Sequence, residues 1–250
     1  SGLWSSADLT TWTLRYSGNV KFIAFGGGRY VICGTNFFAW STDYITWNNV
    51  TAYTDTFLRV RYDGTRFVAG SNTNVWISTD GATWTSNAKP SGIGYMTDVI
   101  SSGTRIVTKG FDNSGGITYG IFYYSDDFGA NWVSAGLSGD REDYVGTFAE
   151  YFSGNFWYST ASSGAPQAAY SPTGVSGSWT QINLSQGTVG TNFNSIAFNP
   201  SNTACICGVS TLGVSYKATT PNAGVAFTVG GTTYSATVGG IGGAGGFPAG

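Results

Sequence analysis

The chain has 250 residues and a formal net charge of −2, with 10% charged residues, 16% aromatic residues and 38 glycines. No basic patch is sustained anywhere along it, which argues against nucleic acid or an anionic membrane as a partner. Histidine is absent, which argues against a metal site or a histidine proton shuttle.

A Ser-x-Asp motif followed by a tryptophan recurs along the chain. The anchor tryptophans are 35, 37, 48 and 47 residues apart, and a period in this range is typical of a repeat fold. Three copies match closely, a fourth has one inserted residue, a fifth has lost the Asp, and a weaker sixth runs from Ala218 to Phe227. The five main copies are Ser6, Asp8 and Trp12; Ser41, Asp43 and Trp47; Ser78, Asp80 and Trp84; Ser125, Asp127 and Trp132; Ser171 and Trp179.

Each copy predicts a hairpin. A strand ends at the Ser, the Asp and a Gly or Thr form the turn through side-chain to backbone hydrogen bonds, and the Trp opens the next strand and packs over the turn. Catalysis needs one site rather than five, so we interpret the motif Asp as structural.

These copies resemble the Asp-box, or BNR repeat, of sialidases, sortilin-type receptors, plant photosystem assembly factors and many phage tail proteins. In those families the motif is the hairpin between the third and fourth strands of a β-propeller blade. The resemblance implies an all-β fold, a β-propeller of four-stranded antiparallel blades. It implies no activity, because the motif marks a fold.

A second repeated hairpin, apolar strand, glycine turn and apolar strand, alternates with the first. It is predicted at Val20–Phe25 with Arg29–Cys33, Leu58–Tyr62 with Arg66–Ala69, Thr97–Ile100 with Arg105–Lys109, Thr147–Phe152 with Phe156–Ser159, and Ser195–Phe198 with Ala204–Gly208. Two hairpins make one blade, so we expect five blades, with the Trp4–Leu14 hairpin completing the blade of Ser195–Gly208. Six blades result if Gly213–Tyr216 and Val225–Val229 form another outer hairpin and Thr232–Val238 supplies a further inner pair.

We place the propeller at residues 1–217 and a short strand pair with a glycine-rich tail at 218–250. The tail resembles the opening of the glycine-rich domain of phage tail fibre proteins, and a flexible linker is the alternative. The chain begins at Ser1 without an initiator Met, which we interpret as a processed product or part of a longer protein. Cys33, Cys205 and Cys207 form no even disulfide framework, and we expect them in the core, with no metal and no cofactor.

Two enlarged loops, Phe111–Gly116 and Leu137–Tyr144, are the predicted ligand site, and Ala161–Gln167 extends the same surface, because loops on a rigid scaffold carry binding residues. In this hypothesis Arg141 and the carboxylates hold sugar hydroxyls while Tyr144, Tyr119 or Trp157 stacks on a ring. The alternatives are a catalytic acid pair with Glu150 or Asp112 opposite, and a solvated loop in which Arg141 neutralises the acids. The candidate residues are Asp112, Asn113, Tyr119, Asp140, Arg141, Glu142, Asp143, Tyr144 and Trp157.

The sialidase pattern of three arginines, a Tyr–Glu pair and an Asp acid has no match here. Arg29, Arg66 and Arg105 recur at one repeat position, and the chain has only two glutamates. We therefore predict no catalytic residues and a non-enzymatic binding or structural module, a virion or extracellular protein of a phage tail or tail fibre. Its expected partners are host cell-surface carbohydrate or other virion proteins, with homo-oligomerisation inside a fibre. The alternatives are a sialidase-like glycoside hydrolase and an assembly scaffold that binds another protein.

Overall fold

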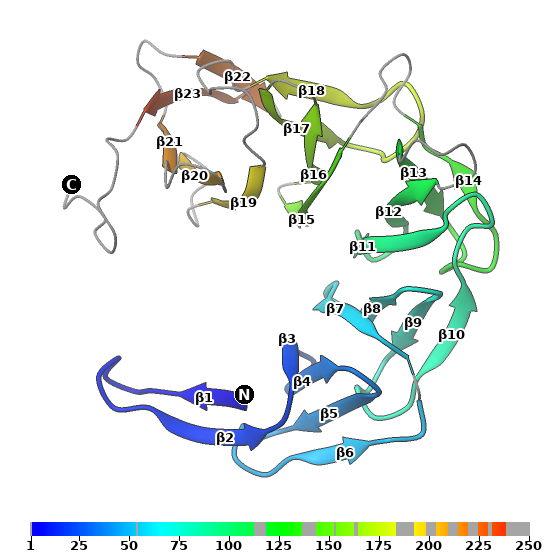
Figure 1. Ribbon diagram of the computed structural model, residues 1–250, viewed down its shortest axis with the longest axis vertical. Helices are drawn as coiled ribbons and strands as arrows, with labels where there is room; N and C mark the ends of the chain where they lie inside the picture. The colour runs from blue at the N-terminus through cyan, green and yellow to red at the C-terminus, as the bar shows by residue number, and fades with distance from the viewer. Residues whose placement is uncertain are drawn as a thin grey trace. The chain divides into compact units, whose positions relative to one another are not determined.

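The computed structural model describes residues 2–53, 55–112, 119–136, 144–152, 154–162, 165–183, 193–198, 204–209, 215–219, 225–229 and 232–238. Within these ranges every regular element is a β-strand (Figure 1), which confirms the all-β prediction. No helix among them is long and apolar enough to span a membrane.

Four sheets have four antiparallel strands in consecutive order. The first contains β3 (Val20–Gly26), β4 (Arg29–Gly34), β5 (Phe37–Ser41) and β6 (Asn48–Val50). The second contains β7 (Phe57–Tyr62), β8 (Phe67–Ser71), β9 (Asn74–Ser78) and β10 (Thr85–Ala88). The third contains β11 (Tyr95–Ser101), β12 (Ile106–Asp112), β13 (Tyr119–Ser125) and β14 (Val133–Ser134). The fourth contains β15 (Tyr144–Phe152), β16 (Asn155–Ser162), β17 (Ala165–Ser171) and β18 (Thr180–Asn183).

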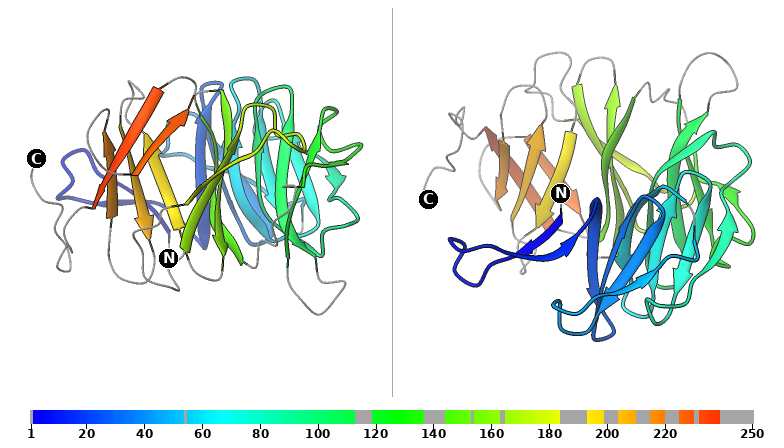
Figure 2. Two further views of the ribbon diagram at one scale, coloured as in Figure 1. Left: turned by 90° about the horizontal axis from the view of Figure 1, so that it is seen from above. Right: turned by 60° about the horizontal axis from the view of Figure 1, so that its bottom comes forward.

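By contact density the chain forms two compact units. Unit 1 comprises Ser1–Phe111 and Phe122–Ser134, and unit 2 comprises Asp112–Ile121 and Ala135–Gly250. Unit 1 also holds a separate two-stranded sheet, β1 (Gly2–Ser5) paired with β2 (Thr13–Ser17). Figure 2 shows this hairpin in dark blue, next to the β3–β6 sheet. Tyr16 of β2 packs there against Phe37 and Trp47 and donates a hydrogen bond to Asn49.

The five predicted inner hairpins are present, and the first four have glycines of positive φ in their turns; the turn of the fifth lies outside the described residues. Gly64 and Gly103 have φ of +100° and +92°, a region that L side chains rarely adopt. Asp63 closes the first of these turns by accepting the backbone N–H groups of Thr65 and Arg66. Local turn chemistry therefore sets where each inner strand ends and the next begins.

The core of unit 1 is aromatic. The Phe38 ring lies parallel to Trp84, with centroids 3.9 Å apart and 4° between the planes, and Phe57 and Trp76 close the cluster from β7 and β9. These rings bury the faces of two neighbouring sheets, which a single repeat could not do alone. Cys33 is buried in the same cluster, as predicted; Cys205 and Cys207 lie in β20 (Ala204–Val209).

The fifth sheet differs from the prediction. Its order is β19 (Phe193–Phe198), β20, β21 (Ser215–Thr219), β23 (Thr232–Val238) and β22 (Val225–Val229). β21 therefore lies beside the Ser195–Gly208 hairpin, where the sequence pattern predicts the Trp4–Leu14 hairpin. The predicted pairing of Trp4–Leu14 with that blade is wrong. The outer hairpin of Gly213–Tyr216 with Val225–Val229, which the six-blade alternative requires, is not formed, since β21 and β22 both pair with β23. A short connection from β20 to β21 costs less closure entropy than a partner some 200 residues away.

This sheet also bears on the predicted domain boundary and tail. β21 crosses the boundary between residues 217 and 218. The glycine-rich residues 239–250 lie outside the described residues. The number of blades remains a prediction.

Candidate ligand-binding site

Most of the predicted binding residues lie where the structure gives no side-chain geometry. Asn113, Asp140, Arg141, Glu142 and Asp143 are outside the described residues. Asp112 ends β12, and Tyr119 begins the neighbouring β13. Tyr144 begins β15. Their roles in binding remain predictions.

The prediction that Trp157 binds ligand is wrong. Its side chain is 1% exposed and lies 4.9 Å from the Tyr170 ring at an interplanar angle of 28°. It sits in β16, the second strand of its sheet, where Phe156 and Tyr158 on either side are also buried. Because both faces of this strand are covered, Trp157 is not available to stack on a sugar ring. Glu150, of the hydrolase alternative, is exposed on β15.

The five motif copies form turns, which we call the Ser–Asp turns (6–12, 41–47, 78–84, 125–132 and 171–179). In the second, the Ser41 hydroxyl donates to Asp43 Oδ1 at 2.9 Å, and the same oxygen accepts the backbone N–H groups of Ile45 and Thr46 at 2.9 and 2.7 Å. The first and third turns repeat this arrangement, and the fourth differs in accepting the N–H of Asn131. The predicted side-chain to backbone turn is confirmed.

These hydrogen bonds hold the turn carboxylates in their ionised form. The backbone N–H groups of Thr46 and Ile45 lower the pKa of Asp43 to about 2. The Asn131 N–H and side chain lower the pKa of Asp127 to about 2, and Thr11 and Thr10 lower the pKa of Asp8 from its ordinary value. At neutral pH these three groups accept hydrogen bonds and carry no proton to donate.

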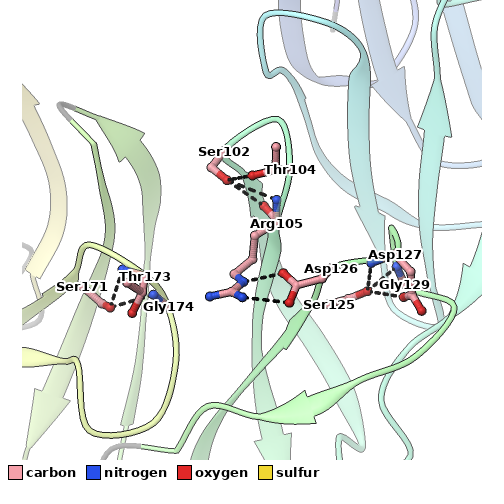
Figure 3. Close-up of polar contacts among 10 residues, drawn as sticks. All are labelled: Ser102, Thr104, Arg105, Ser125, Asp126, Asp127, Gly129, Ser171, Thr173 and Gly174. Atoms are coloured by element: carbon pink, nitrogen blue, oxygen red, sulfur yellow. Dashed lines mark hydrogen bonds and ion pairs between the residues drawn. The ribbon is translucent and has the colours of Figure 1, made fainter.

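The fifth turn lacks the Asp and keeps the geometry. The Ser171 hydroxyl oxygen accepts the N–H groups of Thr173 and Gly174 at 3.2 and 2.7 Å (Figure 3). It also lies 2.6 Å from the Ser178 hydroxyl. The motif serine thus contacts a second serine here, whereas it contacts the Asp carboxylate in the other four turns.

The repeated arginines contact these turns, as expected of repeat residues. Arg29 donates to the carbonyl of Asp80 in the next sheet. Arg66 lies 3.9 Å from the Phe128 ring centroid of the sheet after its own. Arg105 makes a two-pronged ion pair with Asp126, Nε to Oδ1 at 2.6 Å and Nη2 to Oδ2 at 2.8 Å (Figure 3).

A second group of charges lies on inner strands β7 and β11. Asp98 accepts two hydrogen bonds from Arg61, at 2.6 and 3.1 Å, and lies 3.2 Å from Nη1 of Arg59. Its side chain is almost fully buried. Two guanidinium groups on one buried carboxylate tie the inner strands of two sheets together, and we interpret this cluster as structural. Among the described residues no group of three metal-ligating side chains occurs.

A cavity of about 330 Å³ lies between the first and second Ser–Asp turns, and we call it the hairpin groove. It is lined by Ser5, Ser6, Ala7, Asp8, Thr11, Thr13, Arg15 and Tyr44. The lining combines four hydroxyl-bearing serines and threonines with one carboxylate, one guanidinium and one aromatic ring. This volume is within the usual range of small-ligand sites.

Arg15 and Tyr44 give the hairpin groove its shape. Arg15 Nε donates to the Ser5 hydroxyl at 2.7 Å, and its guanidinium lies 5.5 Å from the Tyr44 ring centroid. Tyr44 follows the turn Asp with φ of +53°, an uncommon conformation for a non-glycine residue, and its side chain is 42% exposed.

Sequence reasoning missed this groove because it gave the first hairpin only a structural role. One signal could have pointed to it. Arg15 is three residues after its anchor Trp, where the other four main copies have Val50, Asn87, Ala135 and Ile182.

The comparisons with known proteins show the fold. No family model matches the chain, and no curated protein matches it. The Dos1 propeller is similar at 12% identity and a TM-score of 0.55, over 81% of this chain and 57% of that one. An ancestral GH74 enzyme is similar at 13% identity and a TM-score of 0.60, over 90% of this chain and 39% of that one. Atg21 in complex with the coiled coil of Atg16 is similar at 8% identity and a TM-score of 0.58, over 83% of this chain and 68% of that one.

The chain is thus a β-propeller fold. At these identities the likeness extends to fold and not to activity. The chain spans little more than half of the Dos1 propeller chain and less than half of the GH74 chain.

Proposed function

We propose that the protein is a non-enzymatic carbohydrate-binding module, an Asp-box propeller of a phage tail or tail fibre that recognises host cell-surface glycan in the hairpin groove. The observation that carries the proposal is the chemistry of the groove lining. The C–H face of a sugar packs on an exposed aromatic ring such as Tyr44. Its hydroxyls exchange hydrogen bonds with side chains such as Thr11, Thr13 and Arg15.

The single carboxylate in the groove lining favours sugar binding over sugar hydrolysis. Asp8 is the only acid among the groove-lining residues, and glycoside hydrolysis uses two facing carboxyl groups. A general acid also needs a raised pKa to hold its proton near neutral pH, whereas the pKa of Asp8 is lowered by backbone hydrogen bonds. The lining therefore supports retention of a sugar without cleavage.

A protein-binding scaffold is the second candidate, and one observation favours it. The β1–β2 hairpin exposes the directly paired Trp4 and Leu14, and the anchor Trp12 just before β2 is exposed as well; exposed apolar patches mark interaction sites. If this candidate is right, a protein partner should copurify with the chain, and loss of Trp4 should release that partner.

The proposal is tested on a panel of bacterial cell-surface polysaccharides, with retention and liberated sugar scored in the same wells. Arg15→Met and Tyr44→Ala should each abolish retention. Tyr95→Ala is the matched control, because Tyr95 is 41% exposed and does not line the groove; its retention should equal wild type. Circular dichroism should show that all three variants are folded.

Each other outcome contradicts part of the proposal. Retention that survives Arg15→Met and Tyr44→Ala would exclude the hairpin groove as the site and return attention to residues 137–144. Liberated sugar would overturn the non-enzymatic assignment. Absence of retention across the panel would favour the scaffold.

A further inference from the structure

The hairpin groove continues into a row of aromatic side chains on the first four-stranded sheet. Tyr44 lies in the turn after β5, Tyr30 in β4 and Phe25 in β3. The ring centroids of Tyr44 and Tyr30 are 5.7 Å apart at 78°, and those of Tyr30 and Phe25 are 4.5 Å apart at 43°. We call these three residues the aromatic row.

Strand register explains the row. Phe25 pairs with Tyr30, and Tyr30 pairs with Ser41, so one line of paired positions crosses β3, β4 and β5. These three strands lie side by side in Figure 1. Directly paired side chains lie on the same face of a sheet. Tyr44 follows Ser41 through the Ser–Asp turn, which brings its ring back against Tyr30. The row therefore runs across the strands and ends at the groove.

The row is open to solvent. Phe25 is 59% exposed and Tyr44 is 42% exposed, while Tyr30 between them is half-buried. The rings meet edge to face or tilted rather than in a parallel stack. Ile23, two residues before Phe25 on β3, is also exposed and extends the apolar surface. An exposed apolar surface continuous with a polar groove is a feature of binding sites.

We propose that the ligand is an internal stretch of a linear polysaccharide, with one sugar in the hairpin groove and the following sugars along the aromatic row. This inference rests on the proposed function and extends it to ligand length. A terminal monosaccharide would occupy the groove alone and leave Tyr30 and Phe25 uncovered. A chain would place successive sugar faces on successive rings, so its affinity should rise with length until the row is covered.

The test uses a polysaccharide that the protein retains, cut to fragments of one to six sugars, with dissociation constants measured by titration calorimetry. Wild type should gain about tenfold in affinity between one and three or four sugars, then level off. Phe25→Ala should remove most of this gain and leave the single-sugar affinity unchanged. Val133→Ala is the matched control, since Val133 is half exposed on β14, outside the row; it should behave as wild type.

The failures of the two proposals are distinguishable. Binding of equal strength at every length, or an equal loss in Phe25→Ala for one sugar and for six, would overturn the polysaccharide track and leave the groove assignment intact. Binding of no fragment by wild type, together with retention of an apolar or proline-rich peptide, would overturn both.

Discussion

Replacing Trp84 by alanine should destabilise unit 1 by about 3–5 kcal/mol, the usual cost of removing a buried aromatic side chain. Trp84 is 4% exposed, lies parallel to Phe38 at 3.9 Å, and donates from Nε1 to the carbonyl of Gly81 at 3.1 Å. The ring stack accounts for about 0.5–1.5 kcal/mol of the loss and the hydrogen bond for about 1 kcal/mol. The cavity and the lost burial supply the remainder.

Trp12 gives a matched control at the same motif position. Its side chain is 54% exposed, so Trp12→Ala should cost less than about 1 kcal/mol. Trp84→Phe should fall between the two, at about 1–2 kcal/mol, because it keeps a ring against Phe38 and loses the indole N–H. Equilibrium urea unfolding followed by far-ultraviolet circular dichroism gives all three values. If the alanine variants of Trp84 and Trp12 shared one midpoint, burial would not decide the energetic role of the anchor.

Acid should weaken the Ser–Asp turns, because the pKa values of Asp43 and Asp127 are about 2 in the folded chain and near 3.8 in the unfolded chain. The stabilisation by these two carboxylates is therefore complete above about pH 4 and lost as the pH falls to about 2. Urea midpoints that stay unchanged between pH 5 and 2 would contradict this. Asp98→Asn should cost about 3 kcal/mol by leaving two arginines without their buried carboxylate, and a wild-type midpoint would show the cluster to be dispensable. Gly26→Ala should cost about 1–3 kcal/mol, because its Cβ would lie 2.0 Å from Tyr62 Cγ; the loss should shrink in a Tyr62→Ala background.

The strands and turns of this fold were predictable because their chemistry is local. Asp43 reaches the N–H groups of residues two and three positions ahead, so a short motif contains all its own partners. Gly64 likewise marks a turn through its own backbone freedom. The aromatic row was less accessible, since Phe25, Tyr30 and Tyr44 become neighbours only after strand register is set.

The other differences arise from contacts between distant residues. Trp12 and Trp84 occupy the same motif position, yet only Trp84 is buried. Phe38 stacks on the Trp84 ring and the Tyr53 hydroxyl bonds its backbone, whereas Trp12 is 54% exposed. Trp157 looked accessible beside an enlarged loop, but the packing of its sheet covers it. The pairing of β21 with β23 has no periodic signal in the sequence at all.

The turn without an aspartate shows that the hairpin tolerates the loss of one motif residue. Ser171 still accepts two backbone N–H groups, and its hydroxyl lies 2.6 Å from the Ser178 hydroxyl. In this turn the motif serine contacts an oxygen seven residues ahead, whereas in the other four turns it contacts an oxygen two residues ahead. The hairpin can therefore persist where a motif residue is missing, so further copies of such a repeat are better found by comparing turn geometry than by comparing sequence alone.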